Sequence, residues 1–157
     1  MGNLVKAAVG LGSNLGDRRA HLDFAAARLQ ALLGNLRVSS YYETVPVGLS
    51  GPQSLFLNAA AVGDAVLSAR ELLEAFLVIE QERGRERPRP NMSRTLDIDL
   101  ILFGDAMIEE PGLAVPHPRF RTRRFVLEPL AAIAPAMRDP VTGQSVADLL
   151  ARTESGH

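Results

Sequence analysis

The stretch RTLDIDLILFG (residues 94–104) places two acidic side chains inside an otherwise apolar β-strand pattern. Side chains along a strand alternate between its two faces, so Asp97 and Asp99 share one face. The same alternation predicts that the opposite face carries Leu96, Ile98, Leu100 and Leu102. Because isolated carboxylates are costly to bury, a strand with two of them on one face needs a compensating partner.

A divalent cation is the partner that the acidic pair favours. Two carboxylates about 7 Å apart on one strand face repel each other unless a cation or a proton lies between them. Oxygen ligands favour a hard cation, so Mg²⁺ or Mn²⁺ suits this pair better than Zn²⁺. Mg²⁺ usually completes its coordination with water and substrate phosphates, which predicts a nucleotide site at the strand. The alternative is that each aspartate forms an ion pair with a neighbouring arginine.

A basic segment precedes this strand. Between residues 83 and 94 there are five arginines and one acid, Glu86. The arginines are Arg83, Arg85, Arg87, Arg89 and Arg94. Guanidinium groups suit phosphate oxygens, so the segment is interpreted as the positive half of a site whose metal half is the acidic pair. A solvated basic loop is the alternative, whereas a nucleic-acid groove is disfavoured because no aromatic residue lies between the arginines.

A second basic cluster begins at His117. Pro116 and Pro118 flank this histidine and hold its backbone extended. Arginines follow at positions 119, 121, 123 and 124. This setting predicts a phosphate contact for His117, although a lone histidine is more often structural or exposed.

Length and composition limit the classes of protein. The chain has 157 residues, of which 46% are apolar and 22% charged, as in an ordinary globular domain. With no cysteine, disulfides, thiolate metal sites and cysteine nucleophiles are excluded. The net charge of −1 and the lack of an apolar stretch of about 20 residues favour neither nucleic acid nor membrane as a partner. We therefore expect one cytoplasmic domain over residues 1–157, with no obligate protein partner.

The order of predicted elements indicates the fold. Strands are expected over residues 4–11, 36–44, 55–67 and the acidic stretch. Helices are expected over 18–33, capped by Asp17 and ended by Gly34, and after the capping box Ser68–Glu71. The order β-α-β-β-α-β predicts a ferredoxin-like α+β sandwich, an antiparallel sheet with helices on one face and the other face left for ligands. A helical C-terminal supplement is expected, with Pro129 near the first turn of one helix and Ser145 capping another.

Six stretches, taken in order, resemble the 6-hydroxymethyl-7,8-dihydropterin pyrophosphokinase family. They are GLGSNLGD (10–17), SSYYETVPVG (39–48), LFLNAAA (55–61), IEQERGRER (79–87), RTLDIDLILFG (94–104) and VPHPRFRTRRFVLEPL (115–130). The resemblance implies one pyrophosphokinase domain that transfers diphosphate from ATP to the hydroxymethyl group of the pterin and releases AMP, in folate biosynthesis. It also implies two Mg²⁺ ions on Asp97 and Asp99.

The resemblance further implies roles for individual residues. Arg85 and Arg94 would stabilise the transferring diphosphate and contact ATP. Arg87, His117 and Arg123 would contact ATP only. Asp99 is a candidate acceptor for the hydroxyl proton. The pterin would contact Thr44, Val47, Phe56, Asn58 and Phe125. Two aromatic rings suit a flat heterocycle and an amide suits its polar edge, but core packing is the alternative for each phenylalanine taken alone.

Two other classes of protein remain open on these residues. Another two-metal phosphoryl or nucleotidyl transferase would explain the two aspartates, but it would not explain Phe56, Asn58 and Phe125. A non-catalytic ligand-sensing module could share the fold, but it has no need of paired aspartates beside an arginine-rich loop. The nucleotide-derived product separates the enzyme classes, because the family implies AMP rather than ADP or pyrophosphate.

Overall fold

The computed structural model describes residues 4–44, 55–83 and 95–155. The strands are β1 (Val5–Ser13), β2 (Leu33–Val38), β3 (Tyr42–Thr44), β4 (Phe56–Ala65), β5 (Asp97–Phe103), β6 (Ile108–Glu110) and β7 (Leu113–Val115). The helices are α1 (Arg18–Leu32), α2 (Ala69–Glu82), the 3₁₀ turn η1 (Phe120–Thr122), α3 (Arg124–Ile133) and α4 (Val146–Ser155).

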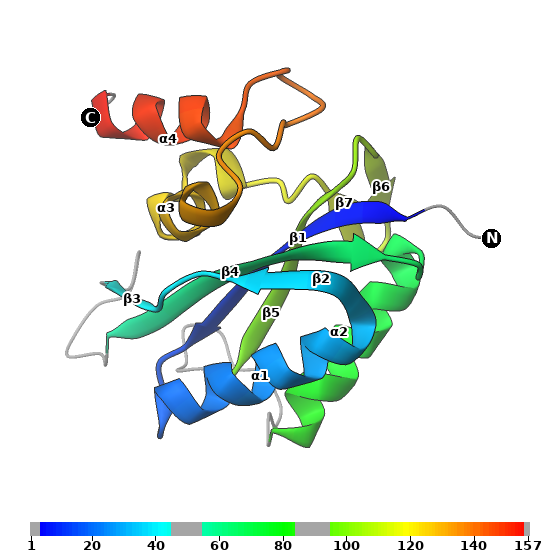
Figure 1. The fold of residues 1–157 in the computed structure, drawn as a ribbon, viewed down its shortest axis with the longest axis vertical. Helices are drawn as coiled ribbons and strands as arrows, with labels where there is room; N and C mark the ends of the chain where they lie inside the picture. The colour runs from blue at the N-terminus through cyan, green and yellow to red at the C-terminus, as the bar shows by residue number, and fades with distance from the viewer. Residues whose placement is uncertain (1–3, 45–54, 84–94, 156–157) are drawn as a thin grey trace.

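The central sheet is antiparallel, with strand order β2-β4-β1-β5 and β3 paired to the same strand as β2 (Figure 1). This order, with α1 and α2 packed on one face, confirms the predicted ferredoxin-like α+β class. The strands β6 and β7 form a separate hairpin.

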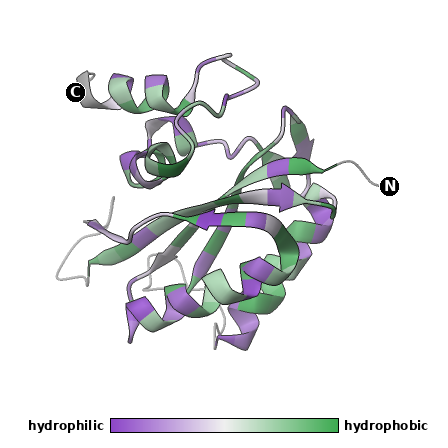
Figure 2. Cartoon of the chain, in the orientation of Figure 1, coloured by the Kyte–Doolittle hydropathy of each residue, from purple (hydrophilic) through white to green (hydrophobic). Residues whose placement is uncertain are grey.

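The second face of the sheet is partly covered, so the prediction that it is left free is wrong for the part that lies under α3 and α4. Figure 1 shows α3 and α4 on the side of the sheet opposite α1 and α2. Ala8, Ala60 and Val62 of the sheet pack there against Leu127 and other buried residues of the C-terminal helices. This part of the sheet face is covered because its side chains are apolar and are buried by the apolar sides of two amphipathic helices. Figure 2 shows the mixed hydropathy of these helices.

Local sequence signals for helix starts are confirmed. Asp17 accepts a hydrogen bond from the N–H of Ala20 at the start of α1. Ser68 and Glu71 form the reciprocal capping box of α2. Ser145 accepts from the N–H of Asp148 at the start of α4. Each cap joins groups three residues apart, which is why sequence alone could identify it.

The prediction that Gly34 ends the first helix is wrong. The helix ends at Leu32, and Leu33 already has extended backbone angles while its N–H still donates to the carbonyl of Leu29. Gly34 therefore lies inside β2, opposite Asp64 of β4. The turn from helix to strand occurs at Leu33, whose buried side chain packs in the core between α1 and the sheet.

The strand expected over residues 36–44 is divided into β2 and β3. Ser39, at the division, is buried, and its hydroxyl accepts from the N–H of Ala60 at 2.9 Å and donates to the carbonyl of Ser40 at 2.8 Å. The serine side chain thus replaces one ladder bond of the neighbouring strand. The chain resumes pairing with β4 at Tyr42.

Pro129 lies deeper in its helix than expected. The helix α3 begins at Arg124, so Pro129 occupies its second turn rather than its first. A proline there cannot donate to the carbonyl of Phe125, four residues earlier. The residues before the helix form the separate 3₁₀ turn η1, and the α-helix itself starts five residues before the proline, at Arg124.

None of the helices within the described ranges has the length and apolar character that crossing a bilayer requires.

Candidate functional site

The acidic pair lies at an accessible end of β5. Asp97 is half-buried and Asp99 is exposed, whereas Ile98 between them is buried against α1 and α2. Asp97 stands opposite Gly12 of β1 and Asp99 opposite Gly10. The predicted common face is therefore borne out by the register, and the facing positions carry no side chains that would cover the carboxylates.

A β-bulge changes the rest of this strand. Val9 pairs with Leu100 and Ala8 pairs with Leu102, so Ile101 is the extra residue. Ile101 and Leu102 both pack in the core beneath α3. The prediction that Leu102 lies opposite the aspartates is wrong, because the bulge shifts the alternation by one residue and places Leu102 on their face.

A row of directly opposed residues crosses the sheet from this pair. Asp97, Gly12 and Asn58 are successive partners on β5, β1 and β4, and directly opposite residues share a face. Neighbouring strands lie about 4.8 Å apart, so the backbones of Asp97 and Asn58 are separated by about 10 Å. A Cβ atom added to Gly12 would lie 3.0 Å from the Nδ2 atom of Asn58. The missing side chain of Gly12 therefore leaves room for the amide of Asn58, which lies above this glycine.

Three of the predicted pterin residues lie together at the far end of this row, on β4 and β3. Thr44 pairs with Phe56 in the register, and both lie on the same face as Asn58. The hydroxyl of Thr44 donates to the Oδ1 atom of Asn58, which leaves the Nδ2 amine as the donor group above Gly12. Asn58 itself is buried, with 8% of its surface exposed, and Phe56 is half-buried.

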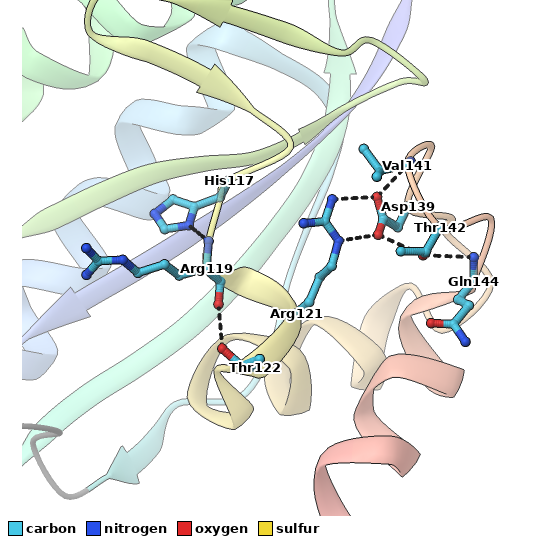
Figure 3. Close-up of polar contacts among 8 residues, drawn as sticks. All are labelled: His117, Arg119, Arg121, Thr122, Asp139, Val141, Thr142 and Gln144. Atoms are coloured by element: carbon cyan, nitrogen blue, oxygen red, sulfur yellow. Dashed lines mark hydrogen bonds and ion pairs between the residues drawn. The ribbon is translucent and has the colours of Figure 1, made fainter. Parts of the chain in front are cut away.

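His117 is anchored beside the acidic strand. The backbone N–H of His117 donates to the carbonyl of the bulged residue Ile101 at 2.9 Å. Its Nδ1 atom accepts from the N–H of Arg119 at 3.2 Å (Figure 3), so the proton of the neutral ring is on Nε2. Burial, and then the charges of Arg123 and Arg119, lower the pKa of His117 below 6.5. At pH 7 the ring is therefore a neutral hydrogen-bond donor within a basic segment.

The start of α3 brings the last two described candidates together. Arg123 is the residue before the helix and Phe125 is its second residue. The guanidinium carbon of Arg123 lies 5.5 Å from the ring centroid of Phe125, within the range of a cation–π contact. The helix packs on β4 and also contacts β3, the two strands that carry Asn58, Phe56 and Thr44.

The remaining predicted residues lie outside the described ranges. They are Val47, Arg85, Arg87 and Arg94.

A buried ion pair supports the segment between His117 and Arg123. Arg121 donates from Nε and Nη2 to both carboxylate oxygens of Asp139, which is fully buried (Figure 3). Asp139 also accepts from the hydroxyl of Thr142 at 2.8 Å and the N–H of Val141 at 3.0 Å. Of the second basic cluster, Arg121 is thus a structural residue that ties η1 to the α3–α4 connection.

Sequence reasoning missed Asp139 and also Glu80. Asp139 begins DPVTG, a turn pattern in which an aspartate commonly caps nearby N–H groups, and that signal could have identified it. Glu80 lies four residues after Phe76 and eight after Leu72, on the buried face of α2. Helical spacing alone could have marked this acid as buried.

The donor set fits a magnesium–nucleotide site. Two carboxylates face one side of β5, and over residues 4–44, 55–83 and 95–155 no group of three or more His, Cys, Asp and Glu side chains is placed to hold a metal ion. Mg²⁺ is commonly bound by one or two carboxylates and completed by water and phosphate oxygens. The arrangement suits such an ion better than an all-protein cage.

Comparison with known proteins gives consistent matches. The family model described as 7,8-dihydro-6-hydroxymethylpterin-pyrophosphokinase (HPPK) matches residues 8–135. A Synechocystis protein named 2-amino-4-hydroxy-6-hydroxymethyldihydropteridine pyrophosphokinase is 40% identical over 94% of this chain and 76% of its own length. A protein of the same name from Methylorubrum extorquens is 40% identical over 96% of this chain and 95% of its own length.

Solved structures match the fold. The crystal structure of wild-type Plasmodium falciparum HPPK-DHPS aligns with 100% of this chain at a TM-score of 0.75 and 16% identity. A further structure, titled as HPPK-DHPS in complex with substrates, aligns with 97% of this chain at a TM-score of 0.78 and 14% identity. This chain spans 47% and 44% of those two longer chains, so at these identities the likeness concerns the fold.

Proposed function

The chain belongs to the 7,8-dihydro-6-hydroxymethylpterin-pyrophosphokinase family, and from that membership we propose how its residues carry out the reaction. It is a transferase of folate biosynthesis that uses ATP as co-substrate and transfers diphosphate to hydroxymethyldihydropterin. The single observation that supports the proposal is the row of Asp97, Gly12 and Asn58, which has the two carboxylates at one end and an oriented amide at the other.

The pterin ring is proposed to lie beside the row of Asp97, Gly12 and Asn58, on the same face of the sheet. The Nδ2 amine of Asn58, oriented by Thr44, donates to an acceptor on the polar edge of the ring. Phe56 and Phe125 contribute aromatic surface from β4 and from α3, and Val47 stays a sequence-based prediction. The missing side chain of Gly12 gives the Asn58 amide room above β1, and so allows the orientation in which the amide meets the ring.

The aspartates are proposed to hold Mg²⁺, with two ions as the predicted number. When bound there, Mg²⁺ neutralises triphosphate charge and thereby reduces the repulsion felt by the incoming hydroxyl. Asp97 and Asp99 present their carboxylates at the other end of this row, where the hydroxymethyl arm would lie. The oxygen of that arm forms a bond to the β-phosphorus, the bond between the β-phosphorus and its bridge to the α-phosphate breaks, and AMP leaves. Asp99 stays a candidate acceptor for the hydroxyl proton.

The basic residues are proposed to orient ATP. His117, neutral and protonated at Nε2, donates one hydrogen bond to the nucleotide, and Arg123 adds a positive charge one residue before α3. Arg85 and Arg94 are proposed to stabilise the transferring diphosphate, with Arg87 as a further ATP contact. Fixed donors of this kind act mainly by positioning and charge stabilisation, which is what diphosphate transfer requires.

We also propose that residues 1–157 act as one domain, because β1, β4 and β5 contribute to both cores. Location in the cytoplasm and activity without an obligate protein partner stay predictions from the sequence.

The product of the reaction tests the proposed function. The protein is incubated with ATP, Mg²⁺ and 6-hydroxymethyl-7,8-dihydropterin, and the nucleotides are separated by chromatography. We expect AMP in amounts that match the pterin diphosphate, and none when the pterin is omitted. Formation of ADP or of inorganic pyrophosphate instead would assign the chain to a different phosphoryl or nucleotidyl transfer.

A substitution at Gly12 tests whether the pterin binds at the Asn58 amide. Gly12→Ala places a methyl group 3.0 Å from Nδ2 of Asn58 and displaces the amide. We expect pterin affinity, measured by calorimetry with a non-hydrolysable ATP analogue, to fall by about tenfold or more. Gly34→Ala is the matched control, since its Cβ would lie 3.8 Å from the nearest atom, the carbonyl oxygen of Asp64. Unchanged pterin affinity in Gly12→Ala would place the pterin elsewhere.

A further inference from the structure

A buried glutamate contacts the backbone between the two aspartates. Glu80, near the end of α2, has only 3% of its surface exposed. Its Oε2 atom accepts a hydrogen bond from the N–H of Ile98 at 2.8 Å. Ile98 is the residue between Asp97 and Asp99. A carboxylate is costly to bury, so its hydrogen bonds are expected to be strong and geometrically defined.

This contact lies at the edge of the sheet. The strand β5 stands at the end of the strand order, next to β1. Edge strands present N–H and C=O groups that no neighbouring strand pairs, and proteins satisfy them by other means. Here Glu80 takes the N–H of Ile98, and the N–H of His117 donates to the carbonyl of Ile101 at 2.9 Å. Two contacts from outside the sheet therefore hold β5 on either side of Asp99.

We propose that Glu80 is a positioning residue for the transfer site, which acts through its hydrogen bond to the N–H of Ile98. The bond fixes the backbone from which Asp97 and Asp99 project, and so fixes the separation of their carboxylates. Groups that orient metal ligands typically change metal affinity by about 10- to 100-fold when they are removed. The inference rests on the proposed role of the two aspartates as Mg²⁺ ligands.

Two conservative variants separate the hydrogen bond from the charge. Glu80→Asp keeps the negative charge but shortens the side chain by one methylene, which withdraws the carboxylate from Ile98. Glu80→Gln removes the charge but keeps an oxygen that can accept the same N–H. Glu82→Gln is the control, because Glu82 lies on the same helix but is exposed and pairs with Arg28.

The first measurement is amide hydrogen exchange of the protein without ligands, followed by NMR. In Glu80→Asp we expect the Ile98 amide to exchange at least about tenfold faster than in the native protein, as loss of a charge-assisted hydrogen bond implies. Amides of the β1–β4 ladder should keep their protection, which shows that the fold is intact. In Glu80→Gln and Glu82→Gln the Ile98 amide should exchange less than about tenfold faster.

The second measurement is the Mg²⁺ concentration needed for half-maximal binding of a non-hydrolysable ATP analogue. We expect this concentration to rise by about 10- to 100-fold in Glu80→Asp and by less than tenfold in Glu80→Gln. The opposite ranking would mean that the charge of Glu80 matters rather than its hydrogen bond, and would overturn the proposal. Unchanged Ile98 exchange and unchanged Mg²⁺ dependence in Glu80→Asp would overturn it too.

The same binding measurement on Asp99→Ala distinguishes failure of the proposed metal site from failure of the proposed role of Glu80. If Asp99→Ala leaves the Mg²⁺ dependence of nucleotide binding unchanged, the proposed metal site is wrong, and with it the premise for Glu80. If Asp99→Ala removes that dependence while Glu80→Asp behaves as the native protein does, only the role of Glu80 is wrong.

Discussion

Replacing Asp99 with alanine should reduce AMP formation by at least about a thousandfold while the protein stays folded. Loss of a metal ligand removes several kcal/mol of charge stabilisation from the transition state, and each 1.36 kcal/mol corresponds to about tenfold in rate. Asp97→Ala should have an effect of the same order. Because Asp97 is half-buried and Asp99 is exposed, we expect both variants to keep the native fold.

The measurement is steady-state AMP formation at saturating ATP and Mg²⁺, with pterin binding followed separately by calorimetry. Pterin affinity should be largely retained, since β1 separates the altered side chain on β5 from Asn58, Phe56 and Thr44 on β4 and β3. Asp105→Ala is the matched control, because Asp105 is an exposed acid in the turn after β5. An Asp99→Ala protein that forms AMP near the native rate would contradict the proposed mechanism.

The largest effect on stability is expected at Asp139. This side chain is fully buried and accepts from Arg121, Thr142 and Val141. Asp139→Ala leaves these donors without their acceptor, and breaking a buried ion pair typically costs about 3–5 kcal/mol. We expect a loss of about 3 kcal/mol in the free energy of unfolding, the lower end, because the Arg121 side chain is 26% exposed and water can solvate it.

Urea unfolding of the native protein and of Asp139→Ala gives the comparison, with Glu110→Ala as control. Glu110 pairs with Arg70 in an exposed ion pair, and such pairs contribute about 0–1 kcal/mol. If Asp139→Ala lost no more than the control, the segment from His117 to Arg123 would have to be held by other contacts.

The same residue predicts a pH dependence. Burial alone would raise the pKa of Asp139, but hydrogen bonds from Arg121, Thr142 and Val141 hold it below its ordinary value of 3.8. A carboxyl group whose pKa is lower in the folded state stabilises the fold above its unfolded pKa, and this contribution is lost as the pH falls through the folded pKa. We therefore expect the acid-induced loss of stability below about pH 4 to be shallower in Asp139→Ala than in the native protein.

Several features of the site could be predicted because they depend on residues close in the chain. Alternation along one strand places Asp97 and Asp99 on the same face, and the register agrees. The positions of Asp17, Ser68 and Ser145 as caps follow from bonds that span three residues. The resemblance to the family added the predicted pterin residues, and the register places one of them, Asn58, across β1 from Asp97.

Other features required contacts between distant segments. No residue pattern within 94–104 predicts the bulge at Ile101. The bulge places Leu102 on the same face as the aspartates, and the carbonyl of Ile101 accepts a hydrogen bond from the backbone N–H of His117. The division of the second strand depends on a hydroxyl bond from Ser39 to Ala60. These outcomes reflect competition between local alternation and the hydrogen bonds offered by neighbouring strands, which sequence periodicity does not contain.

The sequence by itself determined the class of fold, the helix starts and the common face of the two aspartates, because capping and alternation act over a few residues. Only the tertiary structure decided how that strand is held. Glu80, on α2, is 18 residues away from its partner Ile98. His117, in the segment after β7, is 16 residues away from its partner Ile101. The packing of these two segments brings both residues to the edge of β5. An unpaired edge must satisfy its backbone groups, and the rest of the fold sets which side chains reach it.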